Sequence, residues 1–203
     1  MKKELKTELT KEKIMDAAMA EFGTKGYTGA SLNTICGADI PKGLLYHNFK
    51  SKDALYLACV KHSFDRLTVC LKDGAPELSL RQYMNIRLRF FEENEQEARL
   101  FFESLLQPPP LLEKQIFELR KEFDQLNQEL YQKILTGIQL RAGVTSQEAM
   151  NYFTLMQNMF NGSFSSPALC GIPLFDAVRM HEEQALKLLD FMIYGIAERG
   201  NMQ

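Results

Sequence analysis

The chain of 203 residues is long enough for one large domain, or for a small domain joined to a larger one. Hydrophobic residues make up 45% of it and charged residues 25%, a composition typical of globular proteins that excludes an intrinsically disordered chain. No apolar run approaches the roughly 20 residues of a membrane span. Because the N-terminus is charged and no apolar stretch follows it, we predict no secretory signal and no membrane partner, and we expect a cytoplasmic protein.

The formal net charge of −2 conceals a difference between two parts of the chain. Residues 1–62 contain ten lysines, no arginine and seven acidic residues, which gives +3, whereas the remainder carries −5. This asymmetry favours an N-terminal part that faces a polyanion. The cysteines, which form no C-x-x-C pair, are Cys36, Cys59, Cys70 and Cys170. Their spacing fits neither a zinc site nor a disulfide framework, so we predict reduced cysteines that mostly serve in packing.

Helical periodicity dominates the chain, and no alternation of period two extends beyond a few residues, so we predict an all-α fold. Four helices are predicted in the N-terminal third, at about 11–25, 32–38, 41–49 and 52–71. Thr10, Ser31 and Ser51 are suitable N-caps for the first, second and fourth of them. Gly26 supplies a stop for the first helix, and Pro41 suits the first turn of the third.

Longer helices are predicted downstream, at about 78–95, 97–106, 111–141, 145–164 and 175–199. The three prolines at 108–110 forbid a continuous helix there. Thr145 with Glu148 three residues later is a capping box, which predicts a helix start. We recognise no strand, repeat or low-complexity segment.

The predicted third helix combines aromatic and basic side chains that a core helix would not need. At about 100° per residue, Leu45 and Phe49 stack on one side and define the inward direction. The outward arc holds Gly43, Leu44, Tyr46 and His47, with Lys42 at its edge. Phenol, imidazole and ammonium groups donate to phosphate oxygens and base edges, and Lys52, in the first turn of the next helix, can meet a phosphate. This pattern predicts a helix-turn-helix whose third helix, the recognition helix, enters the major groove of DNA.

The segments "IMDAAMAEFGTKGYTGASLNTI" and "PKGLLYHNFKSKDALYLACV" together resemble the DNA-binding domain of TetR family transcriptional regulators of the TetR/AcrR type, over about residues 10–60. The shared motifs are A-x-x-x-F-x-x-x-G-Y, small-Leu-x-x-Ile and K-G-x-L-Y-x-x-F-x-S-K. The resemblance implies an N-terminal three-helix helix-turn-helix domain, residues 1–57. It also implies a C-terminal helical bundle, residues 58–203, that dimerises and usually binds a small ligand.

Carried over position by position, the resemblance assigns DNA contact to residues in and around the recognition helix. Within the helix these are Lys42, Gly43, Leu44, Tyr46, His47 and Asn48, and around it Thr28, Ser31 and Lys52 are phosphate contacts. Six residues separate Ile35 from Lys42, where the family usually has seven, so the second helix is shortened or the turn is tightened. Since residues 1–62 lack arginine, the commonest reader of guanine, base specificity must rest on other side chains and on DNA shape.

The last two predicted helices, about 146–164 and 175–199, are apolar around most of their circumference. One domain core cannot receive both sides of such helices, so we predict that a second copy of the chain covers the rest. The resemblance places a dimer interface in the same helices. A two-fold dimer would present two recognition helices about one DNA turn apart and would bind a near-palindromic operator in double-stranded DNA.

Many aromatic rings lie on the middle helices, a pattern found more often in cores than in ligand sites. Helical domains lined by aromatic and methionine side chains nevertheless bind apolar ligands. Our hypothesis is an apolar or amphipathic effector between the helices that carry Phe102, Phe117, Met156 and Phe160. The effector would change the spacing of the recognition helices and so weaken DNA binding.

The sequence thus predicts a homodimeric repressor released from its operator by a small effector. The alternative is a helical ligand- or partner-binding module that has lost specific DNA binding, for which the shortened turn is the support. An enzyme is disfavoured, because no acid–base pair, cofactor motif or metal-ligand spacing stands out. We therefore predict no catalytic residue, no cofactor and no metal site, and we interpret His62 and His181 as structural histidines.

Overall fold

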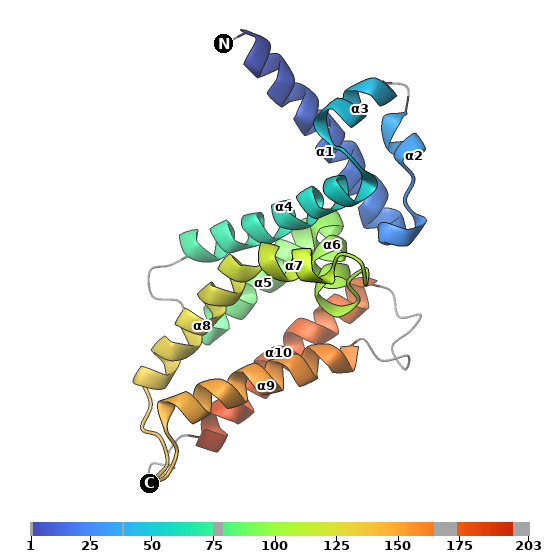
Figure 1. Ribbon diagram of the computed structural model, residues 1–203. Coiled ribbons are helices and arrows are strands. Elements are labelled where there is room, and N and C mark those ends of the chain that lie inside the picture. The colour runs from blue at the N-terminus through green and yellow to red at the C-terminus, as the bar shows by residue number, and fades with distance from the viewer. Residues whose placement is uncertain (1, 38, 75–78, 165–173, 197–203) are drawn as a thin grey trace. The chain divides into compact units, whose positions relative to one another are not determined.

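The computed structural model describes residues 2–37, 39–74, 79–164 and 174–196, which form ten helices and no β-strand (Figure 1). Two compact units are present, one of residues 1–66 with 93–120 and one of residues 67–92 with 121–203. The chain passes between the units within one helix, again near residue 93, and again near residue 120. The separate domain 1–57 stays a prediction, but the compact unit that contains it also includes residues 93–120.

The first unit is built from six helices. They are α1 (Lys2–Gly29), α2 (Leu32–Cys36), α3 (Lys42–Asn48), most of α4 (Lys52–Asp73), α6 (Glu95–Leu106) and α7 (Glu113–Leu119). Ile14, Ala18 and Phe22, which recur every four residues along α1, are buried, and α1 packs along α6. A Cβ built on Gly23 would lie 3.0 Å from Gln96 Cβ, so the two helices touch closely there. Aromatic contacts between Phe22 and Tyr56, and between Phe64 and Phe101, complete this core at ring-centroid distances of 5.2 and 4.7 Å.

Several helix boundaries differ from the sequence-based expectation. Helix α1 begins at Lys2, so Thr10 lies inside it and is not its N-cap, because the preceding Lys, Glu and Leu residues are strong helix formers. Helix α2 ends at Cys36. The single helix predicted at 111–141 is wrong: two helices form, α7 and α8 (Lys121–Thr136), separated at Arg120 by backbone angles of −89° and 0°. No glycine or proline marks this break.

Several local predictions are confirmed. Gly26 interrupts the regular path of α1 with φ of 66° before one further turn. The Ser51 hydroxyl accepts a hydrogen bond from the Ala54 N–H at 3.1 Å, as expected of an N-cap. Cys36 and Cys59 are buried free thiols, and burial raises the pKa of Cys59 to about 12, whereas Cys70 is exposed. Cys170 lies outside the described residues.

The second unit contains α5 (Leu80–Glu93), α8, α9 (Ser146–Phe164) and α10 (Leu174–Ile196). Helices α9 and α10 lie side by side (Figure 1). The capping box is confirmed, since the Thr145 N–H donates to Glu148 Oε2 at 2.9 Å and the Thr145 hydroxyl accepts from the Glu148 N–H at 3.2 Å. Stacked rings of Tyr131 and Phe153, 4.8 Å apart, join α8 to α9. None of the described helices is both long and apolar enough to cross a membrane.

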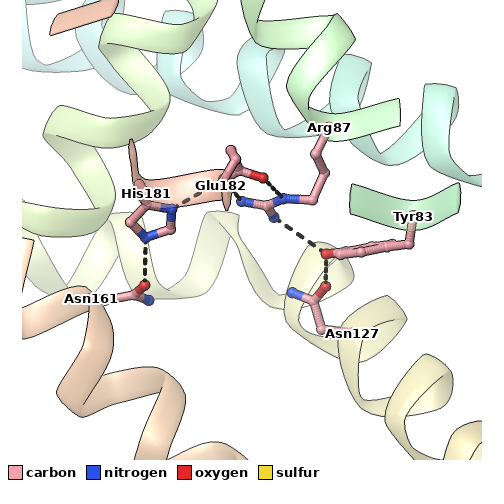
Figure 2. Close-up of polar contacts among 6 residues, drawn as sticks. All are labelled: Tyr83, Arg87, Asn127, Asn161, His181 and Glu182. Atoms are coloured by element: carbon pink, nitrogen blue, oxygen red, sulfur yellow. Dashed lines mark hydrogen bonds and ion pairs between the residues drawn. The ribbon is translucent and has the colours of Figure 1, made fainter. Parts of the chain in front are cut away.

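A buried ion pair connects α5 to α10 in this unit (Figure 2). Two nitrogens of the Arg87 guanidinium donate to the two carboxylate oxygens of Glu182, each at 2.7 Å. Burial alone would raise the pKa of Glu182, but the guanidinium more than offsets this and holds it at about 2. Burial alone would likewise lower the pKa of Arg87, and Glu182 reverses that shift. Both groups are therefore charged in the folded protein.

Polar side chains from α8 and α9 extend the ion pair into a network (Figure 2). Arg87 Nη1 donates to the Tyr83 hydroxyl at 3.3 Å, and that hydroxyl donates in turn to Asn127 Oδ1. On the other side, the two ring nitrogens of His181 lie 3.1 Å from Glu182 Oε1 and 3.0 Å from Asn161 Oδ1. His181 is buried, as expected of a structural histidine, whereas His62 is exposed.

Candidate nucleic-acid interface

Helices α2 and α3 are joined by a short turn that is fixed at both ends. The Ser31 hydroxyl accepts a hydrogen bond from the Asn33 N–H at 3.2 Å, which confirms Ser31 as the N-cap of α2. Gly37 ends α2 with φ of 41°, a left-handed value that favours glycine. The Ile40 N–H then donates to the Cys36 carbonyl at 3.0 Å, and Pro41 leads into α3.

Helix α3 has one buried side and one open side. Leu45 is 0% exposed and Phe49 is also buried, so the predicted inward anchors are confirmed. On the other side, Tyr46 is 53% exposed and His47 is exposed as well. A Cβ built on Gly43 would meet no atom within 4 Å, so the backbone itself is open to a partner at this point. The outward aromatic face therefore has the accessibility that groove contact needs.

The remaining candidates of α3 differ in how free they are to bind. Lys42 and Leu44 are exposed. Asn48 is half-buried, and its side-chain amide donates to the Leu44 carbonyl at 2.8 Å, so one of its donors is used within the helix. Contact with a base by the Asn48 amide nitrogen would compete with this hydrogen bond.

Thr28 and Lys52, two of the three phosphate contacts predicted around α3, form a candidate phosphate site. The Lys52 ammonium lies 4.9 Å from the centroid of the Tyr27 ring and donates to the Thr28 carbonyl at 3.4 Å. Thr28 is exposed and Lys52 is half-buried. The structure thus brings these two predicted phosphate contacts together, with Tyr27 beneath the ammonium.

Glu21 of α1, which was not predicted from the sequence, fixes the start of α2. The buried Glu21 carboxylate accepts hydrogen bonds from the Ser31 N–H at 3.0 Å and the Lys25 ammonium at 2.9 Å. Burial alone would raise its pKa, and these two partners lower it below the ordinary value. Ser31 is therefore tied by both its hydroxyl and its backbone. No sequence signal marked Glu21, since an acidic residue in a long surface helix is usually solvated.

The four predicted effector contacts divide between the two units. Phe102 and Phe117 belong to the first unit, where Phe102 is buried against Phe101 and Phe117 is 54% exposed beneath the Arg120 guanidinium. Met156 and Phe160 lie half-buried on α9 in the second, and the Phe160 ring lies 4.8 Å from the His181 ring. Their grouping around one ligand stays a prediction.

The capped α2, the short turn and the outward face of α3 define an all-α protein of the helix-turn-helix class. Residues 14–59 match the family model described as bacterial regulatory proteins, tetR family, so this part of the chain is similar to the domain that the family shares. The predicted resemblance and fold class are thereby confirmed. Members of the family are transcription regulators and not enzymes.

Two regulators are similar in sequence to part of the chain. The HTH-type transcriptional regulator RutR of Escherichia coli K12 is 33% identical over 107 residues, 50% of each chain. IcaR of Staphylococcus aureus strain Newman, a negative regulator of the biofilm operon icaADBC, is 43% identical over 58 residues, 28% of this chain and 31% of its own. The matched region therefore spans half the length of RutR and less of IcaR.

Solved structures share the fold over most of the chain. FadR from Bacillus subtilis, in complex with stearoyl-CoA, has a TM-score of 0.64 at 17% identity and covers 91% of this chain and 98% of its own. A TetR family regulator from Shewanella sp. PV-4 has a TM-score of 0.63 at 17% identity, with 94% and 99% covered. At such identity the likeness is one of fold.

Proposed function

We propose that the protein is a DNA-binding transcriptional repressor that acts as a homodimer on a near-palindromic operator. The observation that carries this proposal is the outward face of α3, where Tyr46 and His47 are exposed while Leu45 anchors the helix in the core. A short helix held in this way presents donors to base edges without having to fold on binding. Thr28 precedes α2 and Lys52 begins α4, directly after α3. The candidate phosphate site that these two residues form would supply the contact that positions α3 on the DNA.

Exposed apolar side chains on α9 and α10 support the homodimer. Phe191 of α10 is 74% exposed, and Tyr152, Leu155 and Met159 of α9 are more than half exposed. The α9 residues recur at spacings of three and four, so they form one stripe, whereas Ala149 and Phe153 on the other side are buried. An exposed apolar stripe of this kind marks an interaction surface, and we propose that a second copy of the chain covers it together with Phe191.

Release by a small apolar or amphipathic effector completes the proposal. The stearoyl-CoA complex of the similarly folded B. subtilis FadR supports this ligand class. Met156 and Phe160 are half-buried, so they can meet a ligand with little rearrangement. Phe117 is exposed, whereas Phe102 is buried and would have to move to contact a ligand. Stearoyl-CoA is therefore a direct first probe: we expect it to raise the melting temperature and to release the operator.

Selection of bound fragments from random double-stranded DNA tests the proposed function. The unmodified chain should enrich a near-palindrome, with affinity that falls steeply as salt rises, because binding releases counterions from phosphates. Tyr46→Ala with His47→Ala should abolish enrichment, whereas His62→Ala, the same change at an exposed histidine of α4, should retain it. No enrichment by the folded, unmodified chain would instead favour the module without specific DNA binding.

A further inference from the structure

Helix α6 contributes one carboxylate to the helix-turn-helix unit. Glu103 is half-buried on α6, and its Oε1 accepts a hydrogen bond from the Tyr27 backbone N–H at 2.9 Å. Its Oε2 accepts a second from the Tyr56 hydroxyl of α4, also at 2.9 Å. One side chain therefore joins the end of α1 to both α4 and α6, across 76 and 47 residues of sequence.

Gly26 makes this junction possible. Its φ of 66° lies in the left-handed region, and a Cβ built there would lie 2.7 Å from Glu103 Oε1. Any other residue at position 26 would be strained and would also displace the carboxylate from the Tyr27 amide. Because Gly26 has no side chain, the Glu103 carboxylate of α6 can approach the backbone of α1 closely enough to accept the Tyr27 N–H.

Tyr27 connects the junction to the candidate phosphate site. Its hydroxyl donates to Asp53 Oδ1 at 2.6 Å, and this hydrogen bond, together with burial, raises the pKa of the phenol. Its ring meets the buried Tyr56 ring edge-on at 4.9 Å and supports the Lys52 ammonium at the same distance. Thr28 follows next in the chain. A change in the position of Tyr27 therefore moves both predicted phosphate contacts.

We propose that Glu103 is a positioning residue for DNA binding, which fixes the Tyr27 amide and thereby sets Thr28 and Lys52 for phosphate contact. The proposal rests on the proposed function. A hydrogen bond from an amide to a carboxylate is charge-assisted and stronger than a neutral one, so its loss frees the segment between α1 and α2.

Three substitutions on α6 separate this role from general stability. Glu103→Met removes both acceptors at similar volume. Glu103→Gln is the conservative variant, because its amide oxygen can accept from the Tyr27 N–H and its amide nitrogen can donate to the Tyr56 oxygen. Glu95→Met is the matched control, since the Glu95 carboxylate accepts from Arg99 on the same exposed side of α6, at 2.9 Å.

Two measurements are compared for each variant. Hydrogen exchange of the free protein should show the Tyr27 amide exchanging roughly tenfold faster in Glu103→Met. Titration of the selected DNA site at several salt concentrations should show affinity reduced by about tenfold and a salt slope smaller by about two, because Lys52 in each subunit of the proposed dimer loses its phosphate contact. Glu103→Gln and Glu95→Met should keep the exchange rate and slope of the unmodified chain.

The outcomes are distinguishable. Equal exchange rates in Glu103→Met and Glu95→Met would overturn the proposal, whatever happens to DNA binding. Reduced affinity with an unchanged salt slope would mean that Glu103 contributes only to the stability of the fold, and this result would also overturn the proposal. Failure of the unmodified chain to bind DNA would overturn the proposed function and the phosphate-setting role together, while the exchange rates would still report whether Glu103 fixes Tyr27.

Discussion

Replacing Glu182 by glutamine removes the carboxylate from the buried network of the second unit at nearly constant volume. The Glu182 side chain is 1% exposed and that of Arg87 7%, so the guanidinium would be left buried without its counter-charge. Breaking one partner of a buried pair costs roughly 3–5 kcal/mol. The shift of the Glu182 pKa from 4.5 to about 2 corresponds to about 3 kcal/mol, the same order. We expect Glu182→Gln to lose about 3 kcal/mol of unfolding free energy.

Urea unfolding followed by circular dichroism measures this loss. Tryptophan fluorescence cannot be used, because the chain contains no tryptophan. Glu183→Gln, the neighbouring exposed glutamate, is the matched control and should stay within about 0.5 kcal/mol of the unmodified chain. The double variant Arg87→Met, Glu182→Met should lose less than the sum of the two single changes, because it leaves no unpaired charge.

The same pair predicts a dependence on pH. The pKa of Glu182 is lower in the folded chain than its ordinary value of 4.5, so the carboxylate stabilises the fold fully above about pH 4.5. This stabilisation is lost as the pH falls towards 2, so the difference between Glu182→Gln and the unmodified chain should shrink over that interval. If Glu182→Gln unfolds at the same urea concentration as Glu183→Gln at pH 7, the ion pair does not stabilise the second unit.

Two further predictions concern the second unit. Phe191→Asp should convert the proposed dimer to a folded monomer in sedimentation, because Phe191 is the most exposed large apolar side chain among the described side chains of α9 and α10; an unchanged dimer would contradict the proposed interface. Thr145→Ala should cost about 1 kcal/mol by removing the hydroxyl that accepts from the Glu148 N–H, whereas Thr145→Ser should retain most of it. Equal losses in both, measured by thermal unfolding, would argue against the capping box.

Most of the fold could be predicted because local spacing decides it. The two faces of α3 follow from the separation of Leu45 and Phe49 by one helical turn, and the caps at Ser31 and Thr145 follow from side chains that bond within three residues. The break at Arg120 could not be predicted, since no local residue type causes it.

The polar contacts between helices far apart in the chain could not be predicted from the sequence. Glu103 lies 76 residues from Tyr27, and Glu182 lies 95 residues from Arg87. Neither glutamate stands in a motif, and each lies on a helix that also carries exposed charged residues. Only the packing of α1 on α6 and of α5 with α10 brings these carboxylates to their hydrogen-bond donors. A single sequence carries no periodic signal for such pairs.

The short turn before α3 bears directly on whether the protein binds DNA. Six residues separate Ile35 from Lys42, and this shortening was the support for a module without DNA binding. In the structure α2 ends after five residues, because Gly37 takes a left-handed conformation and the Ile40 N–H bonds back to Cys36. The end of α2 is thus fixed by a backbone hydrogen bond, and α3 keeps its buried anchor Leu45. The turn therefore gives no physical reason to expect that the recognition helix has lost its function.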